Sequence, residues 1–119
     1  MRRIALAALF ALSVTPACAI DPNAPEQCIT GPIERTYGGT PWLVASCSDG
    51  KSLVFVAKEG GKAAPFEFDL TFTGDDYDLA GHGKGDRKFT DAAYADLQKL
   101  TGKDVLDLLQ ATKAAKPKN

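Results

Sequence analysis

The spacing of apolar residues changes once along this chain, and that change limits the folds open to it. Up to residue 82 large apolar side chains tend to recur at every second position, most clearly in the run FEFDLTF over residues 66–72. From residue 90 onward they fall three or four positions apart. A period of two is that of a strand with one buried face, and the wider spacing is that of an amphipathic helix. The chain therefore predicts strands followed by helices.

Five strand-like runs precede the helical part, at residues 33–37, 42–47, 53–57, 66–72 and 77–82. Thr90 is predicted to be the N-cap of the first helix, and Gly102 the glycine that ends it. Val105, Leu108 and Leu109 continue at helical spacing. Strands grouped before helices favour an α+β fold. We expect an antiparallel meander of four to five strands, two C-terminal helices packed on one face, and one disulfide.

The side chains of the last hairpin predict its register. If Thr73 and Asp76 close the turn, the large apolar residues of both strands share one face. The other face then carries Glu67 and Asp69, with His82 opposite one of these two carboxylates. A slip of one residue would place aromatic side chains on both faces, so the alternative register is disfavoured.

The hairpin around Asp49-Gly50 has a different pattern, because both of its faces are apolar. Asp-Gly between two strand-like runs predicts a two-residue turn with Ser48 paired to Lys51. One face then carries Trp42, Val44, Leu53 and Phe55, and the other carries Leu43, Ala45, Val54 and Val56. We expect these strands to be central and covered on two sides. The helices cover one side, and the N-terminal segment, the loop at residues 60–65 or a protein partner covers the other.

The N-terminus predicts export. Two arginines are followed by an uncharged stretch from Ile4 to Leu12 and then by Ala17-Cys18-Ala19, which together have the pattern of a secretory signal over residues 1–19. The apolar stretch is shorter than a bilayer span, so we expect no stable membrane insertion. The mature protein is then periplasmic or secreted. In the alternative, Cys18 is the lipid-modified first residue of a lipoprotein, which Thr15 disfavours because such sites usually carry Leu three positions before the cysteine.

Cleavage after Ala19 leaves 100 of the 119 residues, which suits one domain. We assign residues 20–112 to a single α+β domain and residues 113–119 to a flexible basic tail. Without Arg2 and Arg3 the chain has 12 basic residues against 15 acidic ones, so its net charge is −3. That balance lacks the basic face on which nucleic-acid binding depends.

Cys28 and Cys47 are the two cysteines that remain after cleavage. In an oxidising compartment a disulfide between them is expected. They lie symmetrically about residues 37 and 38, so they can face each other across two adjacent antiparallel strands.

No catalytic constellation is visible. His82 is the one histidine of the chain, and no serine lies in a Gly-x-Ser-x-Gly elbow. His82 with Glu67 and Asp69 offers the ligands of a metal site, but solvent-facing strands commonly carry such residues without a metal. We therefore assign no catalytic residue, no metal and no cofactor. Trp42 is either a core residue or a binding anchor, and with Glu67, Asp69 and His82 it forms the candidate binding surface.

These observations predict a non-catalytic binding or interaction domain of the cell envelope, with a protein partner as one occupant of the apolar sheet face. One alternative is an inhibitor that enters the active site of an envelope enzyme through a loop such as Glu59–Pro65 or Gly81–Lys88. Another is a small enzyme that uses His82 with Glu67 or Asp69.

Overall fold

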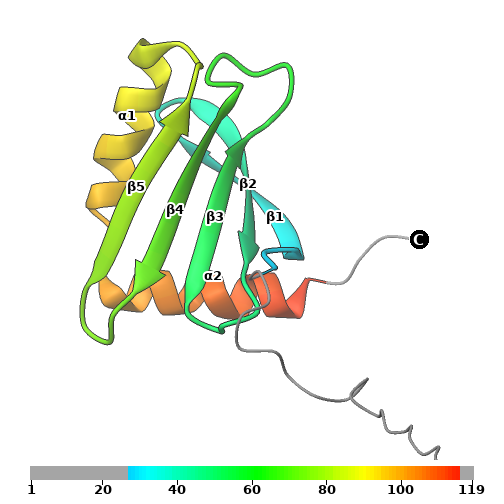
Figure 1. The fold of residues 1–119 in the computed structure, drawn as a ribbon, viewed down its shortest axis with the longest axis vertical. Helices are drawn as coiled ribbons and strands as arrows, with labels where there is room; N and C mark the ends of the chain where they lie inside the picture. Colours follow the sequence, from blue (N-terminus) through cyan, green and yellow to red (C-terminus); the bar gives the residue numbers. More distant parts are fainter. Residues whose placement is uncertain (1–26, 116–119) are drawn as a thin grey trace, which may run out of the picture.

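The computed structural model of the chain describes residues 27–115, which form a five-stranded antiparallel sheet followed by two helices (Figure 1). The elements are β1 (Thr30–Tyr37), β2 (Thr40–Ser46), β3 (Ser52–Ala57), β4 (Phe66–Phe72), β5 (Tyr77–Gly83), α1 (Arg87–Gln98) and α2 (Gly102–Ala114). The predicted signal at residues 1–19, with its alternative at Cys18, and residues 116–119 of the predicted tail lie outside the described residues. Lys113 and Ala114, which we assigned to the tail, are part of α2.

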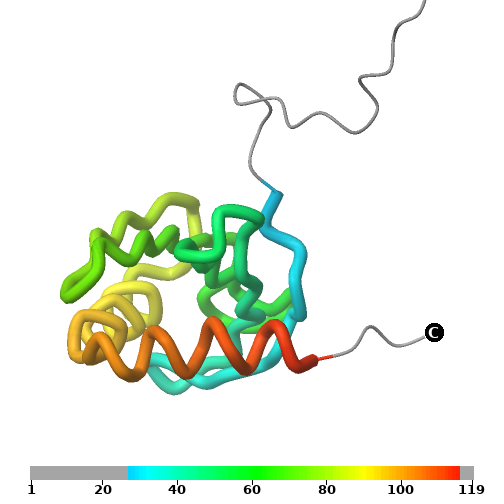
Figure 2. The backbone as a smooth tube through the Cα atoms, turned by 90° about the horizontal axis from the view of Figure 1, so that it is seen from below, coloured from blue at the N-terminus to red at the C-terminus, as the bar shows by residue number. Residues whose placement is uncertain are grey.

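The strands follow one another across the sheet in chain order, each antiparallel to the next. Both helices lie on the same side of the sheet, as the view from below shows (Figure 2). The predicted α+β meander with two C-terminal helices is therefore confirmed.

The hydrophobic core fills the space between the sheet and the two helices. Its largest members are three aromatic side chains on neighbouring strands, Trp42, Phe55 and Phe68, all of them fully buried. Trp42 also donates a hydrogen bond from Nε1 to the main-chain oxygen of Tyr37 (3.0 Å). From the helices, Leu97 and Val105 close the core from below.

The register of the last hairpin is the predicted one. Phe72 pairs with Tyr77, Leu70 with Leu79, and Phe68 with Gly81. These residues all lie on the side of the helices. On the other side His82 stands opposite Glu67, which decides between the two carboxylates that the sequence left open.

The hairpin of β2 and β3 also has the predicted register, with Val44 opposite Phe55, but its turn is longer than expected. β2 ends at Ser46, two residues before Ser48, and β3 begins at Ser52, one residue after Lys51, so the predicted Ser48–Lys51 pair lies outside both strands. The reason is the Asp49 carboxylate, whose Oδ1 accepts hydrogen bonds from the main-chain N–H groups of Lys51 and Ser52 (2.9 Å each). The Asp49 side chain thus makes the hydrogen bonds of the turn that we expected between the main chains of Ser48 and Lys51.

The expected second cover of the central strands is not found among residues 27–115. Val56 is 40% exposed, and Leu43 and Val54 are partly exposed. The loop between β3 and β4 does not fold over this face. Instead it packs at the end of the sheet, where Ala63 is fully buried and leaves no room for a side chain at Gly85.

Helix α1 begins earlier than predicted. Asp86 is its N-cap, with a carboxylate that accepts from the main-chain N–H of Lys88 (2.9 Å), and Thr90 lies buried inside the helix. Asp caps helices at least as well as Thr does, and Asp86 comes first along the chain. The prediction of Thr90 as the cap was wrong for this reason.

Gly102 begins α2 and does not end α1. Thr101 is the N-cap of α2, and it forms a reciprocal capping box with Asp104 through hydrogen bonds of 2.8 and 3.1 Å. The main-chain N–H of Thr101, which donates to the Asp104 carboxylate, and then the Thr101 side chain hold the pKa of Asp104 below its usual value, because both favour the ionised carboxylate. The Thr-x-x-Asp pattern at residues 101–104 therefore marks a helix start, which the glycine between them concealed.

Cys28 and Cys47 form the predicted disulfide. The turn between β1 and β2 lies at Gly38-Gly39, one residue later than the symmetric centre that the two cysteines suggested. A shift in register between Thr30 and Ile33 compensates for the difference, so that the cysteines still face each other. The disulfide thus joins the start of the described chain to the end of β2.

We expect the double change Cys28→Ala and Cys47→Ala to lower the free energy of unfolding by about 3 kcal/mol, because the bond closes a loop of 19 residues and restricts the unfolded chain. Urea unfolding of the two proteins, each exported so that the bond can form, measures the difference. An unchanged midpoint would contradict a stabilising role.

The turn between β1 and β2 docks on α1 through a glycine. A Cβ at Gly38 would overlap the backbone of Ala93, and the Gly38 N–H donates to Asp96 Oδ2 (2.7 Å). Gly39, its neighbour, has nothing within 4 Å of the same position, although both residues have a positive φ. The close approach of sheet and helix therefore depends on Gly38.

We expect Gly39→Ala to cost about 1–2 kcal/mol, the ordinary penalty of a left-handed residue with a side chain. Gly38→Ala adds overlap with α1 to the same penalty, so its cost should exceed that of Gly39→Ala by about 1–3 kcal/mol. Thermal or urea unfolding of both variants separates the two terms. Equal losses would show that the turn does not rest on α1.

Candidate functional site

The sheet has one side that the helices do not cover, here called the open face. It is formed by the alternate residues that point away from the core, among them Leu43, Ala45, Val54 and Val56 on the central strands and Glu67, Asp69, Ala80 and His82 on β4 and β5. Cross-strand pairing sets these residues in rows. Val56 stands beside Glu67 and Glu67 beside His82, while Val54 stands beside Asp69. An apolar stripe therefore borders an acidic cluster.

The cluster consists of Glu67, Asp69 and His82. One ligand atom from each residue lies within 4.8 Å of the others, and His82 Nδ1 lies 3.9 Å from Asp69 Oδ2. The imidazole is 63% exposed. A nitrogen–oxygen distance of 3.9 Å is an ion pair only when His82 is protonated, and it is too long for a hydrogen bond.

The pKa of Glu67 is raised above its usual value. The main cause is a hydrogen bond with Asp69 that requires a proton on Glu67, followed by desolvation and by the charge of Asp69, while His82 acts in the opposite direction. Asp69 Oδ1 is shielded from solvent and has no hydrogen-bond donor when Glu67 is ionised. A proton on Glu67 supplies that donor, so the two observations describe one pair of carboxylates that favours a shared proton.

Two carboxylates and one imidazole could also hold a divalent cation, since oxygen and nitrogen ligands of this kind suit Mn²⁺, Zn²⁺ or similar ions. A cation would relieve the repulsion between Glu67 and Asp69 in place of the proton. For general acid–base chemistry the cluster is less suited. A catalytic imidazole needs a fixed orientation held by neighbouring groups, and the ring of His82 stands largely in solvent.

Two hollows flank the cluster on the open face. One, of about 470 Å³, lies where the face meets the loop before β4 and is lined by Val56, Glu59, Pro65, Phe66, Glu67 and His82. The other, of about 240 Å³, lies toward the disulfide, with Cys28, Cys47 and Val54 among its lining residues. Glu67 lines both. The acidic cluster therefore lies between two shallow hollows of the open face.

Three of the four candidate residues come together in this way, and Trp42 does not. Trp42 is fully buried beneath the sheet on the side of the helices, because it pairs with Ala57 in the row that faces the core. Of the two interpretations of Trp42, the structure favours the core residue. The surface neighbours of the cluster are instead Val54 and Val56.

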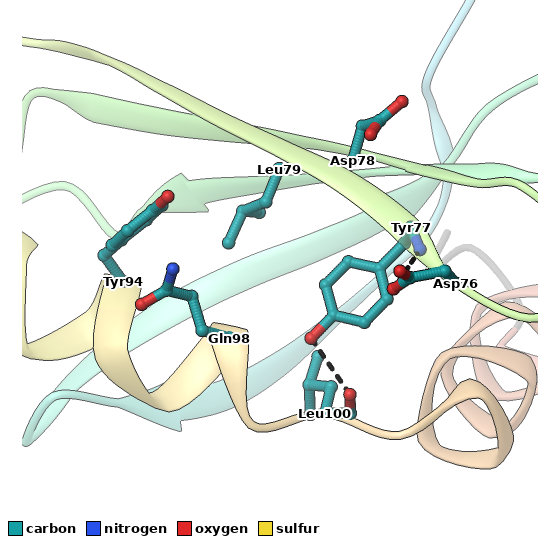
Figure 3. Close-up of a pocket in the computed structure, with 7 residues that line it drawn as sticks. All are labelled: Asp76, Tyr77, Asp78, Leu79, Tyr94, Gln98 and Leu100. Atoms are coloured by element: carbon teal, nitrogen blue, oxygen red, sulfur yellow. Dashed lines mark hydrogen bonds between the residues drawn. The ribbon is translucent and has the colours of Figure 1, made fainter.

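A further hollow, which sequence reasoning missed, lies between β5 and α1 (Figure 3). Tyr94 of α1 borders it and is 38% exposed. No local pattern in the sequence marks this hollow, because its lining comes from β5, α1 and the segment after α1.

No family model, curated protein or solved structure matches the chain. Within residues 27–115 no helix has the length and apolar character that crossing a membrane requires. What can be said of function therefore rests on the surfaces themselves.

We expect Glu67→Gln to be at least as stable as the unchanged protein at pH 7. The raised pKa of Glu67 means that its ionised form costs folding free energy, a cost that is complete above the folded-state pKa and absent below the unfolded value of about 4.3. The advantage of the variant should therefore fade as the pH falls to 3. Urea unfolding at several pH values, with a chelator present to remove metal ions, measures it.

The matched control is Asp78→Asn, which removes one negative charge from an exposed residue of β5 on the open face, away from the pair of Glu67 and Asp69. A Glu67→Gln protein that is less stable than the unchanged one at pH 7, and equal to it at pH 3, would contradict the shared-proton pair.

Proposed function

We propose that this protein is a non-catalytic interaction domain of the cell envelope that binds a protein partner through the open face. The observation that carries the proposal is the one-sided cover of the central strands. Val56 is 40% exposed and Leu43 and Val54 are partly exposed, on strands whose other side is fully buried. Apolar residues on both sides of central strands are typical of sheets that are covered twice.

The stripe and the cluster together describe the partner. Removing the apolar stripe from water favours association by about 25 cal/mol for each Å² buried. Glu67 and Asp69 beside it favour a surface with a positive charge, since opposite potentials steer and align two proteins. A partner with an apolar patch flanked by Lys or Arg satisfies both features.

The predicted export of the protein supports a function in the cell envelope. The N-terminal sequence has the pattern of a secretory signal, with Ala17-Cys18-Ala19 as its cleavage site. A disulfide between Cys28 and Cys47 suits an oxidising compartment. The periplasm or the secreted fraction is therefore the place where we look for the partner.

The inhibitor and enzyme alternatives have weaker support. The two loops of an inhibitor contact each other, since Ala63 of one packs against Gly85 of the other, which is unlike a free loop that enters an active site. The enzyme would need His82 held in one orientation, and its ring is largely exposed.

The test is a comparison of partner recovery by two variants with the unchanged protein. Val56→Glu places a charge in the apolar stripe. Leu106→Glu places the same charge on α2, at a similarly exposed residue (46%) far from the open face. Tagged full-length chains are captured from the envelope fraction of the cell that exports them, and the proteins bound are quantified by mass spectrometry.

We expect one partner to be retained by the unchanged protein and by Leu106→Glu, and its recovery to fall at least tenfold with Val56→Glu. Unfolding midpoints of all three proteins are measured as well, because Glu at position 56 stands opposite Glu67 and like charges opposite each other lower stability by up to about 1 kcal/mol. All three proteins should still be folded under the conditions of capture. Equal recovery by Val56→Glu would exclude the open face as the binding surface.

A further inference from the structure

The outer edge of β5 presents main-chain groups without a partner strand in the described residues. β5 is the last strand of the sheet. At one end of the β4–β5 hairpin the main-chain N–H of Thr73 donates to the main-chain oxygen of Asp76, and at the other end that of Lys84 donates to Pro65. Residues 76 and 84, which flank β5, are thus both hydrogen-bonded to the residues that flank β4. Antiparallel pairs alternate between bonded and non-bonded positions. It follows that Leu79, Gly81 and Gly83 direct their N–H and C=O groups outward.

This edge lacks the features that commonly protect a sheet edge. The opposite edge, β1, contains Pro32, a register shift after Thr30 and the charged pair Glu34 and Arg35. Such features prevent another strand from adding to a sheet. In β5 the seven pairs with β4 run without a shift, and the strand has neither proline nor lysine. Of the two edges, β5 is the one open to an added strand.

Helix α1 lies alongside this edge and forms with it a groove, here called the β5–α1 groove (Figures 1 and 3). Two hollows follow one another along it. The first, of about 300 Å³, is lined by Tyr77, Leu79, Tyr94, Gln98 and Leu100 among others, and the second, of about 360 Å³, by Phe66, Phe68, Leu79, Gly81 and Tyr94 among others. Leu79 and Tyr94 border both, so the hollows are neighbours.

The distance between the hollows matches the repeat of a strand. One lies between Tyr77 and Leu79, the other between Leu79 and Gly81, which is a step of two residues along β5. Two residues of strand span about 7 Å, and every second side chain of a strand points to the same side. A strand added to β5 would therefore place side chains i and i+2 into the two hollows.

Gly81 lets the rings of Phe66 and Phe68 lie directly over β5, where they form a wall of the second hollow. A Cβ at this position would lie 2.7 Å from the ring of Phe68 and 2.8 Å from that of Phe66. Without it the two rings border the space that an incoming side chain would enter. The second hollow is thus an apolar pocket with aromatic walls.

The groove is held open by a fixed contact at one end. The Tyr77 hydroxyl donates to the main-chain oxygen of Leu97 (2.6 Å) and lies 2.9 Å from that of Leu100, as Figure 3 shows for Leu100. This contact ties the start of β5 to the end of α1. A groove that exists before binding spares the partner the cost of forming it.

The charge of the groove indicates the character of the occupant. Asp76 lines the first hollow and Asp91 the second, where Asp91 lies 3.6 Å from Arg87 of the same helix, and neither hollow has a Lys or Arg in its lining. Asp78 borders the first hollow, but its side chain points to the open face of β5 (Figure 3). A positively charged segment is therefore favoured over an acidic one.

We propose that the β5–α1 groove binds an extended, basic polypeptide segment as a sixth strand of the sheet. Its main chain bonds to Leu79, Gly81 and Gly83, two apolar side chains at i and i+2 fill the hollows, and flanking Lys or Arg residues face the aspartates. Strand addition of this kind takes its affinity from main-chain bonds and its specificity from the pockets. This goes beyond the proposed function, because the groove and the open face are separate surfaces.

The probe is an acetylated and amidated hexapeptide with the sequence Lys-Val-Thr-Leu-Thr-Lys, titrated into the ¹⁵N-labelled protein. We expect saturable shifts of the amide resonances of Leu79, Gly81 and Tyr94. At saturation the outward amide of Gly81 should exchange with solvent at least tenfold more slowly, while that of His82, already bonded to β4, should not change. Absence of shifts along β5, or shifts at Val54 and Val56 instead, would overturn the proposal.

Peptide controls separate strand addition from non-specific apolar contact. In an added strand every second N–H group donates to β5 and the others point to solvent. We therefore compare a peptide N-methylated at Val and Leu with one N-methylated at the two Thr residues. One of the two should lose binding and the other should keep it. Replacing both Lys residues by Glu should weaken binding at least tenfold at low salt, and less at high salt. Equal binding of both N-methylated peptides would refute strand addition.

Protein variants complete the test. Tyr94→Ala should weaken peptide binding at least tenfold, whereas Leu106→Ala, at another exposed helical residue, should leave it unchanged. Val56→Glu should also leave it unchanged, so that failure of this inference and failure of the proposed function are distinguishable. Shifts along β5 that grow with protein concentration in the absence of peptide would identify a second copy of this chain as the occupant and overturn the proposal.

Discussion

The rest of the structure depends on the burial of one aromatic face of the sheet beneath two helices. Trp42, Phe55 and Phe68 stand side by side on neighbouring strands, and their combined surface must be removed from water for the chain to fold. Because α1 and α2 both lie on the same side of the sheet, they supply one cover and not two (Figure 2). Because Gly38 has no Cβ atom, α1 can approach the turn between β1 and β2 closely enough to serve as that cover.

The two candidate surfaces are consequences of this one-sided cover. With both helices below, the other side of β2 and β3 is only partly covered by the described chain, and the open face results. Ala45 is buried there, Leu43 and Val54 are partly exposed, and Val56 is 40% exposed. With α1 placed beside β5, the edge of that strand faces a helix across a groove. A third helix, or a longer loop before β4, would have hidden one or the other.

Both surfaces carry acidic side chains next to apolar ones, and the two differ in how they recognise a partner. The open face presents side chains alone, with Glu67 and Asp69 close enough to compete for a proton or to hold a cation. The β5–α1 groove adds main-chain N–H and C=O groups, which read an extended backbone whatever its sequence.

The sequence by itself determined the class of fold, the register of both later hairpins and the disulfide, because these follow from local periodicity and from cysteine spacing. FEFDLTF can bury its aromatics in one register only, and that register also placed His82 near Glu67. The starts of the helices also follow from local signals, the Asp86 cap and the Thr101–Asp104 capping box, although Thr90 and Gly102 competed with them in the sequence. The tertiary structure decided which apolar face of β2 and β3 stays open, because the two faces are equally apolar in the sequence. The packing of α1 against Gly38 and of the loop against Gly85 places the cover on one side, and contacts between residues far apart in the chain leave no periodic signal along it.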